Sequence, residues 1–244
     1  MGDGSYHACM NLILVPGFWL GAWSWEKVTP ALEEAGHHVT SMTRPGLESV
    51  DDDRTGIGMS DTIAAVVDLI DRADGDVVLV GHSGGGNVVY GAADRRPGRV
   101  KHIIYVDCAP VPHGVQVNPD LEGTEGVEVP LPEWDYFREG EDDDLRDLTD
   151  EMLEEIRSKA IPEPWGMAYD QLELTDFARY DIPMTIISTT FTSSEIDHAI
   201  GTGGAFFSEL PHVSYLDIVE LPTGHWPQFT KPNELAKAIL DALS

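Results

Sequence analysis

Short apolar runs alternate with segments of helical periodicity along most of this chain. Residues 11–15 (Asn-Leu-Ile-Leu-Val) end at a Pro-Gly pair, and residues 77–80 (Val-Val-Leu-Val) form a second unbroken apolar run. Runs of this length without a polar face are typical of strands buried on both sides in a parallel sheet. Between them, apolar residues recur at the spacing of one helix face: Ile63, Val66, Val67 and Ile70. The alternation predicts an α/β fold with a mostly parallel central sheet flanked by helices.

The same alternation continues on both sides of one long interruption. The further expected elements are helices at 23–35, 84–94 and 233–243, a helix with Ser60 as its N-cap, and strands at 38–42, 100–106, 182–188 and 215–221. Between about residues 110 and 180 the pattern breaks into Pro-rich stretches, an acidic segment and one helix near 151–159. We expect a single domain spanning residues 1–244, with a small helical cap inserted at about 110–180.

Composition and charge exclude several classes of partner. The chain has 244 residues and 42% of them are hydrophobic, which is enough for one sizeable core. Its formal net charge of -28 would repel nucleic acids and anionic membranes, so we expect neither as a partner. The acidic surface is either well solvated or an adaptation to salt-rich surroundings. No apolar run is long enough to span a bilayer.

The cysteines and the start of the chain bear on its location. Cys9 and Cys108 are the two cysteines, and one pair in a chain of this length is more typical of free thiols than of a disulfide framework. Residues 1–9 lack the basic region and the long apolar stretch of a signal peptide. We therefore expect a cytoplasmic protein. We expect it to be a monomer or a homodimer.

The strongest candidate for chemistry is Gly81-His82-Ser83-Gly84-Gly85, which matches G-x-S-x-G between an expected strand and an expected helix. In that context a sharp turn lifts the serine hydroxyl above the sheet, and the neighbouring glycines permit the strained backbone. The following helix directs backbone N–H groups toward developing negative charge. The segment lacks the Lys and the glycine spacing of a phosphate-binding loop. Ser83 is therefore the expected nucleophile.

His225 is the expected general base. It lies in the stretch Thr-Gly-His-Trp, directly after the last expected strand and before the final helix. Loops at the C-terminal ends of parallel strands are where catalytic groups gather in open α/β sheets, and a base there can reach Ser83. The chain has nine histidines, so position and not residue type selects His225; the alternative is a structural histidine in a glycine-containing loop.

The opening of the chain resembles that of a known family. The likeness rests on Leu-Val-Pro-Gly-Phe-Trp-Leu-Gly-Ala-Trp-Ser-Trp at 14–25 and Ala-Leu-Glu-Glu-Ala-Gly-His at 31–37. These segments look like the start of α/β-hydrolases akin to plant methyl esterases, hydroxynitrile lyases and bacterial esterases. The likeness covers nearly the whole chain and is loosest in the insertion, which would correspond to the family's cap over the active site.

The resemblance implies an oxyanion hole made of two backbone N–H groups, those of Phe18 and Gly84. The family usually has His where this chain has Pro16, and because the donor is backbone we expect the hole to survive. Trp19 and Trp226 are the expected substrate-pocket residues. For the side chains of Phe18 and Trp19 the alternative is ordinary pocket or core packing.

The acid of the triad is the least regular feature. In most members of the resembled family an Asp follows the strand corresponding to 184–188, but Phe191 stands there in this chain. Some members carry the acid at the end of the preceding strand, where this sequence has Asp107. We expect Asp107 to orient His225; a hydrogen-bonded strand-end Asp without a catalytic part is the alternative. The rival acids are Glu195 and Asp197.

We expect no metal and no cofactor. The acidic runs at 51–53 and 141–144 lack an ordered ligand spacing, so solvated loops are the simpler interpretation.

These residues predict a serine hydrolase that cleaves a small carboxylic ester, lactone or thioester through an acyl-enzyme. Two alternatives stay open. Hydroxynitrile lyases carry a Lys directly after the catalytic His, where this chain has Trp226, which argues against carbon–carbon lysis. The other alternative is a non-catalytic receptor that holds a small ligand in the same pocket, and the unusual place of the acid motivates it.

Overall fold

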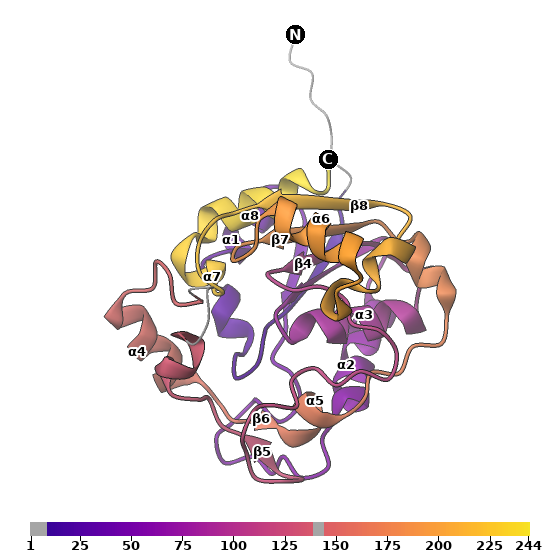
Figure 1. Ribbon diagram of the computed structural model, residues 1–244. Helices are drawn as coiled ribbons and strands as arrows, with labels where there is room; N and C mark the ends of the chain where they lie inside the picture. The colour runs from indigo at the N-terminus through magenta and orange to yellow at the C-terminus, as the bar shows by residue number, and fades with distance from the viewer. Residues whose placement is uncertain (1–8, 139–143) are drawn as a thin grey trace.

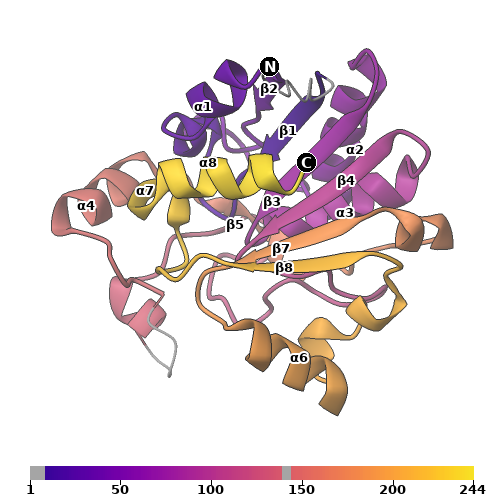
Figure 2. The same ribbon diagram turned by 90° about the horizontal axis from the view of Figure 1, so that it is seen from above.

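The computed structural model describes residues 9–138 and 144–244 (Figures 1 and 2). Within these residues, the strands of the central sheet are β1 (Asn11–Val15), β2 (His38–Ser41), β3 (Val77–His82), β4 (Val100–Val106), β7 (Met184–Ser188) and β8 (Leu216–Glu220). Their order is β2-β1-β3-β4-β7-β8, and all neighbouring pairs run parallel. The α/β fold with a parallel central sheet is confirmed.

The winding of the sheet reverses between β1 and β3. The chain moves from β1 to β2 on one side, and then returns to place β3, β4, β7 and β8 on the other. The loops that follow β1 and β3 therefore diverge, which leaves a crevice at the carboxyl ends of these strands. Those two loops contain Phe18 and Ser83, so the topology brings together residues that lie far apart in the sequence.

Helices cover both faces of the sheet (Figure 2). They are α1 (Thr29–Glu34), α2 (Met59–Arg72), α3 (Gly85–Arg95), α6 (Ser193–Thr202) and α8 (Pro232–Asp241). Leu12 and Leu14 of β1 share one buried cluster with side chains of α1 and α8, whereas Ile13 and Val15 share the other with α2, α3 and α6. The period of two along the strand thus separates two cores. Among the described residues, no helix is both long and apolar enough to cross a bilayer.

The segment between β4 and β7 packs beside the carboxyl ends of the strands. It contains an antiparallel pair, β5 (Glu128–Val129) with β6 (Glu163–Pro164), the helices α4 (Asp150–Lys159) and α5 (Trp165–Tyr169), and 3-10 turns at Trp134–Arg138 and Phe177–Asp181. The expected cap was helical, and the strand pair was missed because two-residue strands leave no periodic pattern. The division into one domain of 1–244 with a cap at about 110–180 stays a prediction.

The helix expected at 23–35 is two shorter elements. A 3-10 turn at Ala22–Trp25 is followed by α1. Pro30 lies in the first turn of α1, where its missing N–H costs no hydrogen bond, and it would clash with the preceding carbonyls if a helix ran through it. The continuous helix was therefore a wrong prediction, and proline was the signal that should have divided it.

The start of α2 also differs from the expectation. Its N-cap is Gly58 and not Ser60. The carboxylate of Asp61 accepts a hydrogen bond from the N–H of Gly58 at 3.0 Å, while the hydroxyl of Ser60 accepts one from Arg95 at 3.0 Å. A carboxylate in the first turn satisfies the helix start without a serine at the cap.

Candidate active site

Ser83 stands on a sharp turn between β3 and α3. The strand ends at His82 and the helix begins at Gly85. The backbone of Ser83 is left-handed, with φ of 51°, a conformation that costs a non-glycine residue about 1–3 kcal/mol. A Cβ on Gly81 would lie 2.8 Å from the carbonyl oxygen of Gly85, so only glycine lets the turn close this tightly. The turn holds the serine hydroxyl at the carboxyl end of the sheet.

His225 reaches Ser83 from the loop between β8 and α7 (Pro227–Thr230). Its Nε2 lies 2.8 Å from the Oγ of Ser83. The backbone of this loop is fixed on two sides, because the N–H of His225 donates to the carbonyl of Asp144 at 2.8 Å and its carbonyl accepts from Nε2 of His82 at 2.7 Å. These two backbone contacts of His225 therefore help to keep its imidazole within hydrogen-bond distance of the Ser83 hydroxyl.

Asp107 completes a continuous chain of hydrogen bonds. Its Oδ2 lies 2.6 Å from Nδ1 of His225. Its Oδ1 accepts hydrogen bonds from the N–H groups of Thr189 and Thr190 at 2.9 and 3.0 Å and from the hydroxyl of Thr190 at 3.0 Å. Because β4 and β7 are neighbours in the sheet, the end of β7 supplies donors to an acid that stands at the end of β4.

The two rival acids lie elsewhere. Glu195 and Asp197 are exposed on α6. The carboxylate of Glu195 accepts from the N–H and the hydroxyl of Thr192, both at 2.7 Å, and so closes the N-terminal capping box of this helix. Of the three candidates, the structure brings Asp107 to His225.

Opposing effects set the charge states of the acid and the base. Burial would lower the pKa of His225, but its hydrogen bond to Asp107 and the negative charges of Asp107 and Asp144 raise the pKa above its ordinary value. Burial would raise the pKa of Asp107, but His225 and the N–H groups of Thr190 and Thr189 lower it to about 2. Asp107 is thus ionised at neutral pH and stabilises the imidazolium form of His225.

A second histidine, His82, lies behind the first. Burial and the charge of His225 lower the pKa of His82 to about 3, so its ring is neutral. Its Nε2 faces the carbonyl oxygen of His225 and therefore carries the proton. Its Nδ1 is buried and has no hydrogen-bond partner in the part of the chain that the structure describes. His82 supports the loop of His225 and is not placed to exchange protons with solvent.

The two residues expected to form the oxyanion hole are in contact. A Cβ on Gly84 would lie 2.3 Å from the ring of Phe18, so the ring packs directly on this glycine. The next N–H along the first loop, that of Trp19, donates to the carboxylate of Glu163 at 2.9 Å and is not available to a ligand. Gly84 is also the N-cap of α3, whose partial positive charge lies at this end.

Backbone strain is concentrated around these residues. In residues 9–138 and 144–244, the non-glycine residues with positive φ are Trp19, Ser83, Asp107 and Asp147. The first three follow β1, β3 and β4 and contribute to the same site. Such conformations persist where the surrounding structure enforces them, and they gather at functional sites.

A cavity of about 490 Å³ opens beside Ser83 and His225. Its aromatic wall consists of Phe18, Trp19, Tyr136, Phe137, Phe206 and Trp226. Asn87, Asn118 and Asp144 add polar groups, and no Lys or Arg is found among the described residues of the lining. Trp19 and Trp226, the expected pocket residues, are 6% and 3% exposed. The wall therefore combines aromatic and polar surface, and its described residues include no cationic side chain that could pair with a negatively charged molecule.

Both cysteines are free thiols. Cys108 lines the cavity and donates to the carbonyl of Gly81 at 3.4 Å. Burial and the negative charge of Asp107 raise the pKa of this thiol, so it is protonated and a poor nucleophile.

The described residues of the two acidic runs at 51–53 and 141–144 are not arranged as metal ligands. Asp52 and Asp53 accept hydrogen bonds from the N–H groups of Ser49 and Thr55 within their own loop. Of the second run, residues 141–143 lie outside the described residues. In the described part of the chain, no group of three or more His, Cys, Asp or Glu is arranged to hold a metal ion. That the chemistry needs no metal and no cofactor stays a prediction.

A family model described as the alpha/beta hydrolase family matches residues 12–238. The chain belongs to this family. An extracellular alpha/beta-hydrolase from a Paenibacillus species has the same fold, with a TM-score of 0.75 at 21% identity over 96% of this chain and 98% of the other. The order of the central strands and the helices on both faces are thus those of alpha/beta hydrolases.

Two curated relatives resemble part of this alpha/beta hydrolase. A carbendazim hydrolyzing esterase from a Nocardioides species is 34% identical over 106 residues, which are 43% of this chain and 44% of the relative. Methylesterase 8 of Arabidopsis thaliana is 36% identical over 100 residues, 39% of this chain and 36% of the relative. The matched region thus spans less than half of either relative.

Sequence reasoning missed several residues that shape the site. Thr189 and Thr190 directly follow β7 and donate to Asp107, but they belong to no recognised motif. Arg44 and Glu163, which contact the loop after β1, gave no signal because 119 positions separate them. A glutamate between two prolines, in Ile-Pro-Glu-Pro-Trp, was the one local hint of a buried carboxylate.

Proposed function

We propose that this alpha/beta hydrolase cleaves carboxylic esters of small molecules, with Ser83 as nucleophile, His225 as general base and Asp107 as the acid. The observation that carries the proposal is the unbroken chain of hydrogen bonds from Ser83 Oγ to His225, 2.8 Å, and from His225 to Asp107, 2.6 Å, at the wall of a cavity. Relatives named as a carbendazim hydrolyzing esterase and a methylesterase support the bond class.

Acylation begins when Nε2 of His225 takes the hydroxyl proton of Ser83. The Oγ forms a bond to the ester carbonyl carbon, and the carbonyl π pair moves onto its oxygen. The N–H groups of Phe18 and Gly84 hold that oxyanion. When the carbonyl reforms, the bond to the alcohol oxygen breaks, and His225 gives its proton to the leaving alcohol. An acyl group remains on Ser83.

Deacylation repeats these steps with water. His225 takes a proton from water, the hydroxide oxygen adds to the acyl carbon, and the same N–H groups hold the second oxyanion. The bond to Oγ then breaks and the proton returns to Ser83. Throughout, Asp107 stays ionised and stabilises the imidazolium, for which its low pKa of about 2 is suited.

The lining of the cavity favours neutral aromatic or apolar esters. Four rings around Phe137 meet at T-shaped or tilted contacts: those of Trp19, Trp134, Tyr136 and Trp226. Trp226 directly follows His225, and its ring is buried in this cluster. Lactones and thioesters would react by the same steps, and a substrate panel separates them from open esters.

Two residues argue against the alternative functions, carbon–carbon lysis and ligand binding without catalysis. Trp226 holds the place of the lysine that carbon–carbon lyases of the resembled branch carry. A receptor role was motivated by the unusual place of the acid, and Asp107 lies 2.6 Å from His225. Ester hydrolysis is therefore the function that the site supports best.

The proposal is tested with p-nitrophenyl acetate and a matched cyanohydrin. We expect the wild-type protein to release p-nitrophenol with burst or steady-state kinetics, and Ser83→Ala to lose at least about 10³-fold in kcat. Cyanide release should not exceed the uncatalysed rate. Ester turnover by Ser83→Ala close to the wild-type rate would contradict the assignment of the nucleophile.

A further inference from the structure

An ion pair lies completely buried beside the loop that follows β1. Arg44 and Glu163 make two contacts, Nη1 to Oε1 at 2.5 Å and Nη2 to Oε2 at 2.8 Å, and both side chains are 0% exposed. The Nε of Arg44 is buried without a hydrogen-bond partner among the described atoms. Burying two charges is costly, and apolar residues of similar volume often serve stability equally well. Stability alone therefore does not explain this pair.

Both partners of the pair hold the backbone of the oxyanion loop. Nη2 of Arg44 donates to the carbonyl of Gly17 at 2.7 Å, and Oε2 of Glu163 accepts from the N–H of Trp19 at 2.9 Å. These two contacts lie on either side of Phe18, whose N–H is the proposed oxyanion donor. The peptide groups next to Phe18 are thus each fixed by one end of the same ion pair.

Further contacts from the segment between β4 and β7 hold Trp19. Its carbonyl accepts from the N–H of Ile161 at 3.1 Å, and its indole Nε1 donates to the carbonyl of Val129 at 3.0 Å. The left-handed backbone of Trp19, with φ of 64°, is costly for a non-glycine residue and needs such restraint. The strand pair β5 and β6 therefore holds the loop after β1 in a strained conformation.

We propose that the Arg44–Glu163 ion pair positions the oxyanion hole. By holding the carbonyl of Gly17 and the N–H of Trp19, it fixes the direction of the Phe18 N–H toward the oxyanion. Neither side chain lines the cavity, so both are positioning residues that act through the loop. The inference rests on the proposed hydrolase function, and it adds a requirement that the segment between β4 and β7 contributes to transition-state binding as well as to the pocket wall.

Two variants test the pair in different ways. Arg44→Leu combined with Glu163→Leu removes both charges together, which avoids leaving one charge buried alone. Glu163→Asp keeps the charge, but its shorter side chain cannot bridge Arg44 and the Trp19 N–H in the present geometry. For both we expect kcat on p-nitrophenyl acetate to fall about 10- to 100-fold while KM changes by less than about 3-fold, because a misplaced oxyanion donor affects the transition state and not ground-state binding.

Inhibitor binding separates positioning from general damage. 2,2,2-Trifluoroacetophenone forms a hemiketal when Ser83 Oγ adds to its carbonyl carbon, the π pair moves onto the oxygen and His225 takes the hydroxyl proton. Acetophenone fills the same space without forming a stable adduct. We expect the affinity for the fluorinated ketone to fall in proportion to kcat/KM in both variants, while the affinity for acetophenone stays within about 3-fold.

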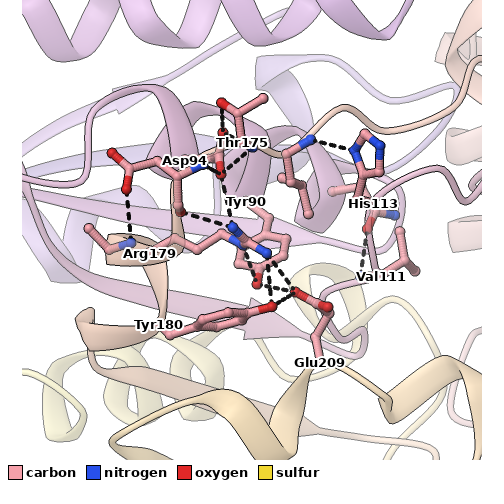
Figure 3. A network of polar contacts seen from close by, with 12 residues as sticks. Tyr90, Asp94, Val111, His113, Thr175, Arg179, Tyr180 and Glu209 are labelled. Carbon is pink, nitrogen blue, oxygen red and sulfur yellow. Dashed lines mark hydrogen bonds and ion pairs between the residues drawn. The ribbon is translucent and has the colours of Figure 1, made fainter.

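The matched control lies in a second buried polar network, shown in Figure 3. Arg179 there pairs with Asp94 at 3.2 Å, with side chains 4% and 2% exposed, and Asp94 accepts from the N–H groups of Thr175 and Asp176. Asp94→Asn disturbs a pair that is also buried and, in the described part of the chain, makes no hydrogen bond or ion pair with the oxyanion loop. We expect it to lower the midpoint of thermal unfolding while the ratio of the two ketone affinities stays at the wild-type value.

The outcomes are distinct. Folded variants at Arg44 and Glu163 with wild-type kcat/KM, or with equal losses for both ketones, would overturn the positioning role. If the double variant does not fold, the kinetics and inhibitor binding of Glu163→Asp test the positioning role by themselves. Ester turnover that survives the substitution Ser83→Ala would instead contradict the proposed function. A wild type that depends on Ser83 but is insensitive to the ion pair would contradict this inference only.

Discussion

Asp107 controls the charge of His225 from a strand other than the one that usually carries the acid. The carboxyl ends of β4 and β7 are adjacent, so an acid on either strand can reach the same imidazole. At the end of β7 this chain has Thr189 and Thr190, and their N–H groups donate hydrogen bonds to the carboxylate of Asp107. Neither residue is an acid that could compete with Asp107 for His225. The acid at the end of β4 is therefore held by donors from the end of β7 while it contacts His225.

Asp107→Asn should lower kcat/KM for an aryl ester by about 10³- to 10⁴-fold, because the amide stabilises neither the imidazolium nor the required tautomer of His225. The matched control is Glu195→Gln, which removes the rival acid from an exposed helix cap and should leave kcat/KM within about 2-fold of the wild type. Steady-state kinetics on both variants shows which carboxylate is the acid. A large loss of kcat/KM in Glu195→Gln, with little change in Asp107→Asn, would assign the acid to α6.

The pH dependence of kcat/KM should follow the raised pKa of His225. The base must be neutral to accept the proton of Ser83, so activity falls as the pH decreases through that pKa. We expect the midpoint of the acid limb above about 6.5, the ordinary value for histidine. In Asp107→Asn the hydrogen bond and the negative charge of Asp107, which raise the pKa of His225 most, are lost, while burial, which lowers it, and the smaller effect of Asp144 remain. Residual activity should therefore persist to lower pH. An acid limb unchanged by this substitution would show that another group titrates.

At the scale of elements, the sequence predicted the sheet well and the connections poorly. Strands buried on both faces need unbroken apolar runs, which is why β1 and β3 were recognised within two residues of their ends. The G-x-S-x-G turn was recognised because its close contacts require glycine. The division of residues 22–35 and the pair β5 and β6 depend on local turns and on pairing between distant segments, which leave no periodic signal.

Gly85→Ala tests the fit of α3 against the end of β1. An added Cβ would lie 2.5 Å from the carbonyl oxygen of Pro16 and 2.7 Å from that of Val15. The helix would have to move, which should destabilise the fold by about 1–3 kcal/mol and lower kcat, because the same turn carries Ser83. Urea unfolding and ester kinetics measure both effects. Gly98→Ala is the control, since its Cβ would meet nothing within 4 Å; equal effects of the two substitutions would show that crowding at α3 is not the cause.

At the scale of the whole molecule, two features lay beyond local sequence patterns. The Arg44–Glu163 pair joins the loop after β2 to β6, and the cavity draws its wall from segments between residues 18 and 226. Only the folded chain shows such long-range pairing. Net charge, by contrast, is known from composition alone. A cytoplasmic location and a monomeric or homodimeric state stay predictions.

Salt should stabilise the folded protein. With 43 acidic and 15 basic residues, repulsion between like charges opposes the compact state, and salt screens it. Raising NaCl from about 0.05 M to about 1 M should increase the free energy of unfolding by about 1 kcal/mol, which corresponds to a rise of about 2–4 °C in Tm for a chain of this size. Thermal unfolding followed by circular dichroism provides the measurement. A Tm that is constant or falls with salt would show that charge repulsion is not limiting.

Mass spectrometry of the intermediate tests the role of Ser83 most directly. The protein is mixed with excess p-nitrophenyl acetate, quenched in acid within the first turnover and digested. We expect one acetyl group on the peptide that contains Ser83, and no acetyl group on this peptide in Ser83→Ala. In a variant such as His225→Ala the acetylated peptide is more abundant only if acylation is faster than deacylation. Hydrolysis at the wild-type rate with no acyl group on Ser83, or with the group on another residue, would contradict the proposed nucleophile.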